Sequence, residues 1–280
     1  MTEFSTSRRN AYIPLPDYIA GGLHNQSEML ASLHEEYHAW TTNRIYGEVE
    51  AGSRDQRVLE GAYAVVRNIG DGELASTNSD VGAILQGAGY GYNLKITNST
   101  ETHGRAASVR THNHRHGINQ GDTLTIDLAQ IADQRAPLIQ EKLRRNELHM
   151  PLEHVAYLMT LRTVAHESAH VIQSSIGKLA GSSGADAVDF MSSLFTEVSG
   201  VNPDVLNEGF AEGYAEIVLT RSLQELGYSE SDQAAILRAM SHRGNDAAIA
   251  KGYDPVPKEG VVHMLEYTMR HIRSRADEDW

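Results

Sequence analysis

Cysteine is absent from this chain, and large aromatic residues are scarce. Its 280 residues include no cysteine, four phenylalanines and two tryptophans. The fold therefore cannot rely on disulfides, and any metal site has to be built from histidine and carboxylate ligands.

Positive charge is also in short supply. Lysine and arginine together number 24, against 37 aspartates and glutamates, which gives a net charge of −13. Nucleic acids and anionic membranes attract positive charge, so we expect neither as the main partner. A hydrophobic content of 40% over this length suffices for one large globular domain.

Long hydrophobic runs are missing as well. No stretch of about 18 apolar residues predicts a membrane-spanning helix. The N-terminal residues lack the apolar segment of a secretory signal, and Pro14 and Pro16 disfavour a helix there, so we expect residues 1–17 to be a disordered leader. The expected location is cytoplasmic, or outside the cell by export without a cleavable signal peptide.

The most informative stretch is His166-Glu167-Ser168-Ala169-His170, an HExxH pattern within a segment of helical periodicity. Residues four apart lie on one helix face, so both imidazoles can bind one zinc ion. Glu167 lies beside them and has the position of a general base toward a water that the metal activates. A hydrolytic zinc site needs one further protein ligand.

A second helix is predicted over residues 202–227 and can supply that ligand. Asn202 is suited to the N-cap, Pro203 to the first helical position and Gly227 to the end. If the two helices pack side by side, Glu208 completes a site of two histidines and one glutamate. Glu212, one turn later, can accept a hydrogen bond from the free N–H of a ligating histidine.

Small residues next to these glutamates predict close helix packing. Gly209 and Gly213 are four apart and would let the two helix backbones approach each other. The alternative is that Glu208, Glu212 and Glu216 form an exposed acidic face on a surface helix.

The two motifs together resemble those of the gluzincins, zinc peptidases whose third ligand is a glutamate on a later helix. The sequence LNEGFA at residues 206–211 is similar to the corresponding motif of the aminopeptidase branch. The resemblance implies Zn²⁺ held by His166, His170 and Glu208, with Glu167 as base and Glu212 behind the ligands. The 37 residues between His170 and Glu208 exceed the aminopeptidase spacing, and no GxMEN motif occurs.

In gluzincins a tyrosine or histidine downstream of the glutamate ligand donates a hydrogen bond to the developing oxyanion. We rank His263 first for this role, followed by Tyr253 and Tyr267. A core tyrosine or surface histidine is the alternative for each of them.

The expected fold class is α+β, a zincin-like domain with a small mixed or antiparallel sheet, an active-site helix and a mainly helical C-terminal half. The domain spans residues 18–280, with a helix and a β-rich part in 18–128 and a helical part carrying the zinc site in 129–280. Strands are predicted at residues 62–69, 91–97, 107–115 and 122–128. Residues 123–127 or 107–110 would be the edge strand that binds a substrate backbone.

A separate cluster consists of His112, His114 and His116, which share one face if the segment is extended. A second metal site and a polar hairpin tip are both open interpretations.

The resulting hypothesis is a zinc metallopeptidase that hydrolyses peptide bonds in a peptide or protein substrate. Two alternatives remain. One is a secreted or translocated effector or toxin that cleaves one specific protein, and the other is a non-catalytic zincin-fold binding module.

Overall fold

The computed structural model describes residues 47–48, 54–87, 92–98, 107–110, 122–128, 130–182, 185–241, 249 and 252–278. The predicted leader and the histidine cluster His112, His114 and His116 lie outside these ranges.

Helices account for most of the described residues. In chain order the elements are β1 (Gly47–Glu48), α3 (Arg54–Val66), the π-helix η1 (Arg67–Asp71), α4 (Gly72–Ala75), α5 (Ser79–Gly87), β2 (Tyr92–Asn98), β3 (Ala107–Arg110), β4 (Asp122–Asp127), the π-helix η2 (Gln130–Arg135), α6 (Ala136–Arg145), α7 (Leu152–Leu179), α8 (Ala185–Ser199), α9 (Pro203–Glu225), α10 (Glu230–Met240) and α12 (Lys258–Glu278). The expected α+β class is therefore wrong, because the described part is predominantly helical and its strands are few and short.

One misassigned segment explains much of this error. Residues 62–69 were predicted as a strand because they include Val65, Val66 and Ile69, which favour strands. They belong instead to α3 and η1. The buried positions Val58, Ala62, Val65 and Ile69 recur at three- and four-residue steps, and burial on that helical face outweighs the strand preference of the single residues.

The sheet has the order β1-β2-β4-β3. β2 and β4 are parallel, with Leu94 opposite Leu124, whereas β3 pairs antiparallel to β4, with Val109 opposite Leu124. β3 is thus an edge strand of this sheet, and β4 is internal. Of the two segments considered as the edge strand, residues 107–110 lie at an edge and residues 123–127 do not.

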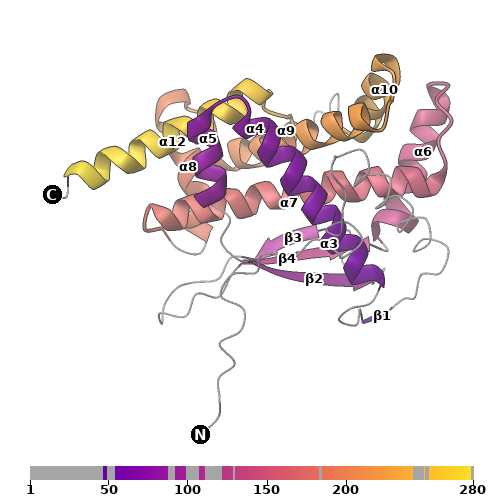
Figure 1. Cartoon of the computed structure of the whole chain (residues 1–280), viewed down its shortest axis with the longest axis horizontal. Coiled ribbons are helices and arrows are strands. Elements are labelled where there is room, and N and C mark those ends of the chain that lie inside the picture. The colour runs from indigo at the N-terminus through magenta and orange to yellow at the C-terminus, as the bar shows by residue number, and fades with distance from the viewer. Residues whose placement is uncertain are drawn as a thin grey trace, which may run out of the picture.

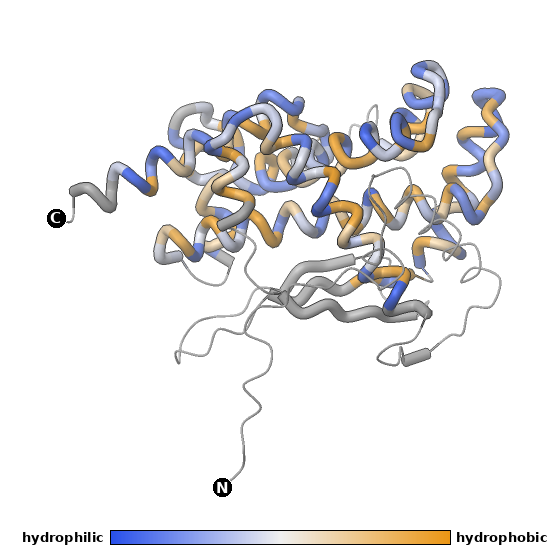
Figure 2. Tube along the Cα trace, in the orientation of Figure 1, coloured by the Kyte–Doolittle hydropathy of each residue, from blue (hydrophilic) through white to orange (hydrophobic). Residues whose placement is uncertain are grey.

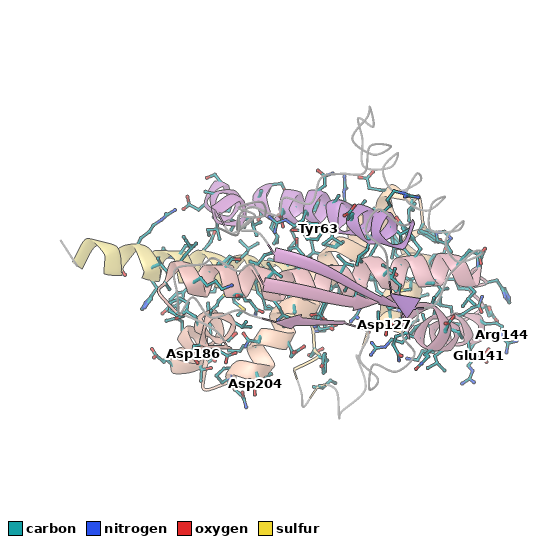
Figure 3. All side chains as sticks on the ribbon, turned by 90° about the horizontal axis from the view of Figure 1, so that it is seen from below. Tyr63, Asp127, Glu141, Arg144, Asp186 and Asp204 are labelled. Carbon is teal, nitrogen blue, oxygen red and sulfur yellow. The ribbon has the colours of Figure 1, made fainter. Side chains whose placement is uncertain are left out.

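Helix α7 is the shared element of the fold. It contacts β3 and β4 on one side and α9 on the other, and α3, α6 and α8 also pack against it. Figure 1 shows the sheet and α9 on opposite sides of α7, and Figure 3 shows from below that the strands lie over this helix. Because it is enclosed in this way, α7 is buried around most of its circumference along nearly its whole length.

The ends of α9 follow the sequence signals. The Asn202 side chain accepts a hydrogen bond from the backbone N–H of Asp204 at 2.9 Å, and Pro203 occupies the first helical position. Gly227 has a φ of +79°, a conformation that favours glycine. These observations confirm the predicted start and stop of the helix.

Hydrophobic and hydrophilic residues alternate along the helices that are coloured in Figure 2. Among the described residues, no helix is both long enough and apolar enough to cross a membrane.

Candidate metal centre

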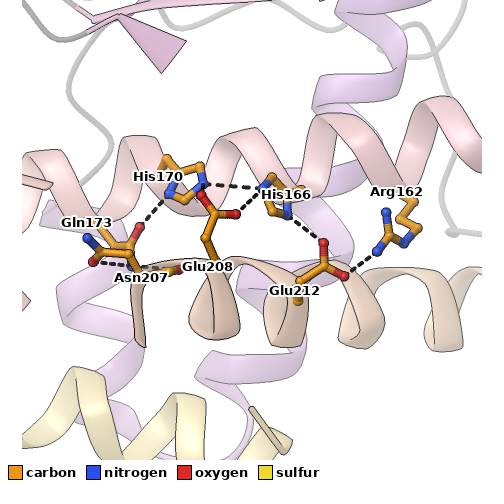
Figure 4. A network of polar contacts seen from close by, with 7 residues as sticks. All are labelled: Arg162, His166, His170, Gln173, Asn207, Glu208 and Glu212. Carbon is orange, nitrogen blue, oxygen red and sulfur yellow. Dashed lines mark hydrogen bonds and ion pairs between the residues drawn. The ribbon is translucent and has the colours of Figure 1, made fainter. Parts of the chain in front are cut away.

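Three side chains from α7 and α9 converge between these two helices. His166 and His170 lie one turn apart on α7, and Glu208 reaches them from α9 (Figure 4). The His166 Nε2 and His170 Nε2 atoms are 3.3 Å apart. Glu208 Oε2 lies 3.3 Å from His166 Nε2, and Glu208 Oε1 lies 3.8 Å from His170 Nε2.

These distances suit a single metal ion. One candidate ligand atom from each residue lies within 4.8 Å of the other two. Metal–ligand bonds of about 2.0–2.1 Å in a tetrahedron put neighbouring ligand atoms about 3.3 Å apart, close to the spacing of His166, His170 and Glu208. The three residues can therefore hold a metal ion.

Two buried atoms of the cluster lack an aligned hydrogen-bond partner. They are Nδ1 of His166 and Oε2 of Glu208, each of which lies near a charged neighbour without hydrogen-bond geometry. Because an unsatisfied buried polar atom costs free energy, a bound cation would remove the cost at Glu208 by coordinating it.

Glu212 lies directly behind the first histidine. Its Oε1 atom is 3.1 Å from His166 Nδ1, and its other oxygen forms an ion pair with Arg162 of α7. Glu212 is only 4% exposed. The negative charge of this buried carboxylate favours a proton on Nδ1 of His166, which leaves Nε2 facing the candidate metal position.

The second histidine is oriented by an amide network. Gln173 Oε1 lies 2.7 Å from His170 Nδ1, and Gln173 Nε2 donates to the backbone carbonyl of Asn207 at 3.2 Å. The Asn207 side-chain amide donates in turn to Asp189 Oδ1 of α8 at 2.6 Å, and the Ser192 hydroxyl donates to Asn207 Oδ1. Helix α8 thus supports the position of His170 through Asn207, the residue next to the candidate ligand Glu208.

Sequence reasoning missed Arg162, Gln173 and Asn207. The available signal was helical spacing, because Arg162 is four residues before His166 and Gln173 is three residues after His170. Asn207 gives no such signal, since its partners come from α7 and α8.

The two histidines differ electrostatically. Burial alone would lower the pKa of His166, but the carboxylates of Glu208 and Glu212 outweigh it and raise that pKa to about 10. Burial and the neighbouring His166 lower the pKa of His170 to about 4. Although burial works against it, the nearby His166 lowers the pKa of Glu208. The acidic surroundings therefore favour one positive charge between these side chains, which is the charge environment that a cation needs.

Glu167 is buried beside the cluster, with 8% of its surface exposed. Its negative charge helps to raise the pKa of His166. It also acts on Arg135 of η2, whose pKa is lowered mainly by burial and by the charge of Arg162. Glu167 thus lies close enough to His166 for its charge to be felt there, and it is not one of the three converging residues.

The three candidate oxyanion donors lie in different surroundings. The Tyr253 ring stacks against His166, with centroids 6.4 Å apart and an angle of 24° between the rings. His263 and Tyr267 of α12 instead contact Phe195 of α8, at centroid distances of 6.0 and 5.0 Å. Of the three, Tyr253 is the one for which the structure shows ring contact with a candidate ligand, although His263 was ranked first.

Gly209 and Gly213 were expected to allow close approach of α7. They face a different segment instead. A Cβ atom on Gly209 would lie 3.2 Å from the carbonyl oxygen of Asp254, and one on Gly213 would overlap the carbonyl oxygen of Val256. The two glycines instead allow residues 252–257 to approach α9. The close approach predicted from the sequence is real, but its partner is a different segment.

Comparisons with protein-family models, curated proteins and solved structures give no match to this chain.

Proposed function

We propose that this protein is a zinc-dependent peptidase. The observation that carries the proposal is the convergence of His166, His170 and Glu208 within 4.8 Å from two packed helices. Two imidazoles and one carboxylate are ligands that zinc accepts, whereas magnesium and calcium prefer oxygen ligands alone. Three protein ligands also leave room for a water or substrate oxygen. The resemblance of the HExxH and LNEGFA motifs to gluzincins supports the same assignment.

Glu167 has the role of general base in this proposal. When bound, zinc would polarise the peptide carbonyl and make water more acidic. Glu167 would accept the proton of the attacking water and then give it to the leaving amine nitrogen. Glu167 is largely buried, and its charge acts on the neighbouring His166, which supports this role.

Tyr253 has the role of oxyanion donor. Its ring lies against His166, and its phenol can donate one hydrogen bond to a carbonyl oxygen that gains negative charge. Glu167 and Tyr253 both influence the pKa of Arg135, which supports a common location for the three groups.

The position of β3 favours an extended peptide as the substrate. β3 is an edge strand of the sheet and contacts α7, the helix that carries the histidines. An edge strand offers backbone N–H and C=O groups that an extended chain can pair with. A peptide added at β3 would therefore run beside the helix that holds the metal site.

The decisive experiment is to incubate the zinc-loaded protein with a cell lysate and to identify new protein termini by mass spectrometry. The parent protein should generate new termini, whereas Glu167→Gln should retain zinc and lose turnover by about 10²–10⁴-fold. Asp186→Asn, at an exposed residue of α8 (Figure 3), is a matched acid-to-amide control that should cleave like the parent.

The outcomes separate the alternatives. Termini in one protein alone would indicate a peptidase with a single substrate. A protein that binds zinc and produces no termini would be a binding module, and a protein that binds no zinc would contradict the proposed metal site.

A further inference from the structure

Residues 252–257 form a segment, here called the tyrosine strap, that crosses α9 beside the metal centre. The strap begins at Gly252, which has a φ of +90° and packs so closely that a Cβ there would lie 2.6 Å from the Cα of Val205. Further along, the backbone N–H of Val256 donates to the carbonyl oxygen of Gly209 at 2.9 Å. The strap is thus attached to α9 on both sides of Tyr253 and Asp254.

Two glycines of α9 determine how closely the strap can approach. A Cβ on Gly209 would lie 3.2 Å from both the Asp254 carbonyl oxygen and Val256 Cγ2. A Cβ on Gly213 would overlap the Val256 carbonyl oxygen and lie 2.9 Å from Val261 Cγ2. Any side chain at Gly213 would therefore push the strap away from α9, and one at Gly209 would do so to a smaller extent.

The same two glycines alternate with the acidic residues of the site. Gly209 follows the candidate ligand Glu208, and Gly213 follows Glu212, so each glycine is rotated by about 100° from its acidic neighbour. One face of α9 consequently supplies the carboxylates, and the adjacent face receives the strap. This arrangement brings the Tyr253 ring to 6.4 Å from that of His166.

We propose that Gly209 and Gly213 are positioning residues. By having no side chain they set the distance between the tyrosine strap and α9, and they thereby hold the Tyr253 phenol at the metal centre. This inference rests on the proposed function for its effect on turnover. The position of Tyr253 can, however, be measured without metal or substrate.

The geometric test uses the metal-free protein with 3-fluorotyrosine incorporated. The ¹⁹F signal of Tyr253 is identified by its loss in Tyr253→Phe. This signal should shift in Gly213→Ala, shift less in Gly209→Ala and stay unchanged in Gly72→Ala. Gly72 is the matched control because it is an exposed helical glycine at which an added Cβ meets nothing within 4 Å. An unchanged Tyr253 signal in both Gly213→Ala and Gly209→Ala would overturn the inference.

The functional test is a double-mutant comparison on a peptide that the parent cleaves. Displacing a reacting group by about 1 Å can cost about 10²-fold in rate, so Gly213→Ala should lower turnover by about 10–10²-fold while zinc affinity stays the same. Tyr253→Phe should lower turnover by about 10²–10³-fold. The double variant should be no slower than Tyr253→Phe alone, because Gly213→Ala acts through a hydroxyl that is already gone.

The results distinguish the two proposals. If the parent cleaves nothing, the proposed function fails, and the ¹⁹F signals still decide whether the glycines position Tyr253. If the parent is active and the two losses multiply in the double variant, the positioning role is wrong. Gly209→Ala provides the same test with a smaller displacement where Gly213→Ala does not fold.

Discussion

Helix α9 takes part in two buried polar clusters, and they are built differently. In one, the Tyr214 hydroxyl donates to Asp71 Oδ1 at 2.6 Å, and Arg67 Nη2 lies 2.7 Å from Asp71 Oδ2. In the other, Glu208 and the two histidines approach one another, yet Oε2 of Glu208 has no aligned hydrogen bond. The first cluster, which we call the closed cluster, is satisfied by protein groups alone. The second, the open cluster, has an oxygen available to a ligand.

This difference supports a structural role for the closed cluster and the proposed ligand-binding role for the open one. Buried polar groups in proteins are normally hydrogen-bonded, so a closed cluster needs no further partner. Gly70 fits this interpretation, because a Cβ there would lie 2.6 Å from the Tyr214 hydroxyl, so the backbone leaves space for that hydroxyl. The open cluster could instead be completed by a cation, because His166, His170 and Glu208 are placed where they can hold one.

The largest expected effect comes from removing a candidate ligand of the open cluster. Glu208→Ala should abolish zinc binding, because two histidines alone leave the ion with too few protein ligands. In the parent, zinc at 100 times its dissociation constant should add about 2.7 kcal/mol to the free energy of unfolding. Urea titrations with and without zinc measure this gain, which Glu208→Ala should lack.

Glu216→Ala is the matched control, since Glu216 lies on the same helix and is not one of the three converging residues. A full zinc-dependent gain in Glu208→Ala would show that Glu208 is not a ligand.

A smaller effect is expected from breaking the closed cluster. Asp71→Ala removes the acceptor of Tyr214 and the partner of Arg67, so the free energy of unfolding should fall by about 1–3 kcal/mol. The zinc-dependent gain should remain, because Asp71 does not contact the ligands. Urea unfolding of the metal-free protein measures this loss.

Glu141→Ala is a suitable comparison, because Glu141 pairs with the exposed Arg144 on the surface of α6, and both residues are labelled in Figure 3. Its replacement should leave the unfolding midpoint unchanged. A loss of zinc binding in Asp71→Ala would mean that the two clusters are not independent.

The smallest effect is a pH dependence of the closed cluster. Burial raises the pKa of Asp71 above its ordinary value of 3.8, and this outweighs the opposing influence of Arg67 and Tyr214. Because the folded pKa is higher than the unfolded one, the stabilising contribution is complete below about pH 3.8 and is lost as pH rises through the folded pKa.

The measurement is the difference in unfolding free energy between the parent and Asp71→Asn, followed from below pH 3.8 upward through the folded pKa of Asp71. The advantage of the parent should decrease as pH rises. A difference that does not vary with pH would contradict the raised pKa.

The chain's local signals were sufficient for the helices that carry the site. The HExxH spacing, the N-cap Asn202 and the terminal Gly227 predicted α7 and α9, since helix periodicity and capping depend on residues close in sequence. The same approach failed at residues 62–69, where strand-favouring valines lie on a buried helical face. Local preference is weak there compared with burial against α7.

Contacts between distant segments were beyond the reach of sequence patterns. Gly209 and Gly213 correctly indicated a close approach, but the approaching backbone comes from residues 252–257 and not from α7. The ranking of His263 above Tyr253 could not be corrected from the sequence. The spacing of these residues from Glu208 does not reveal that the Tyr253 ring is the one near His166.

The sequence by itself determined the types of the candidate ligands, because two histidines four apart and a glutamate on a capped helix are local features of the chain. Only the tertiary structure decided that Glu208 meets both imidazoles, that Gln173 and Asn207 orient His170, and that Tyr253 lies over His166. The physical reason is that helix packing and strap attachment depend on contacts between residues far apart in sequence, and no local spacing encodes them.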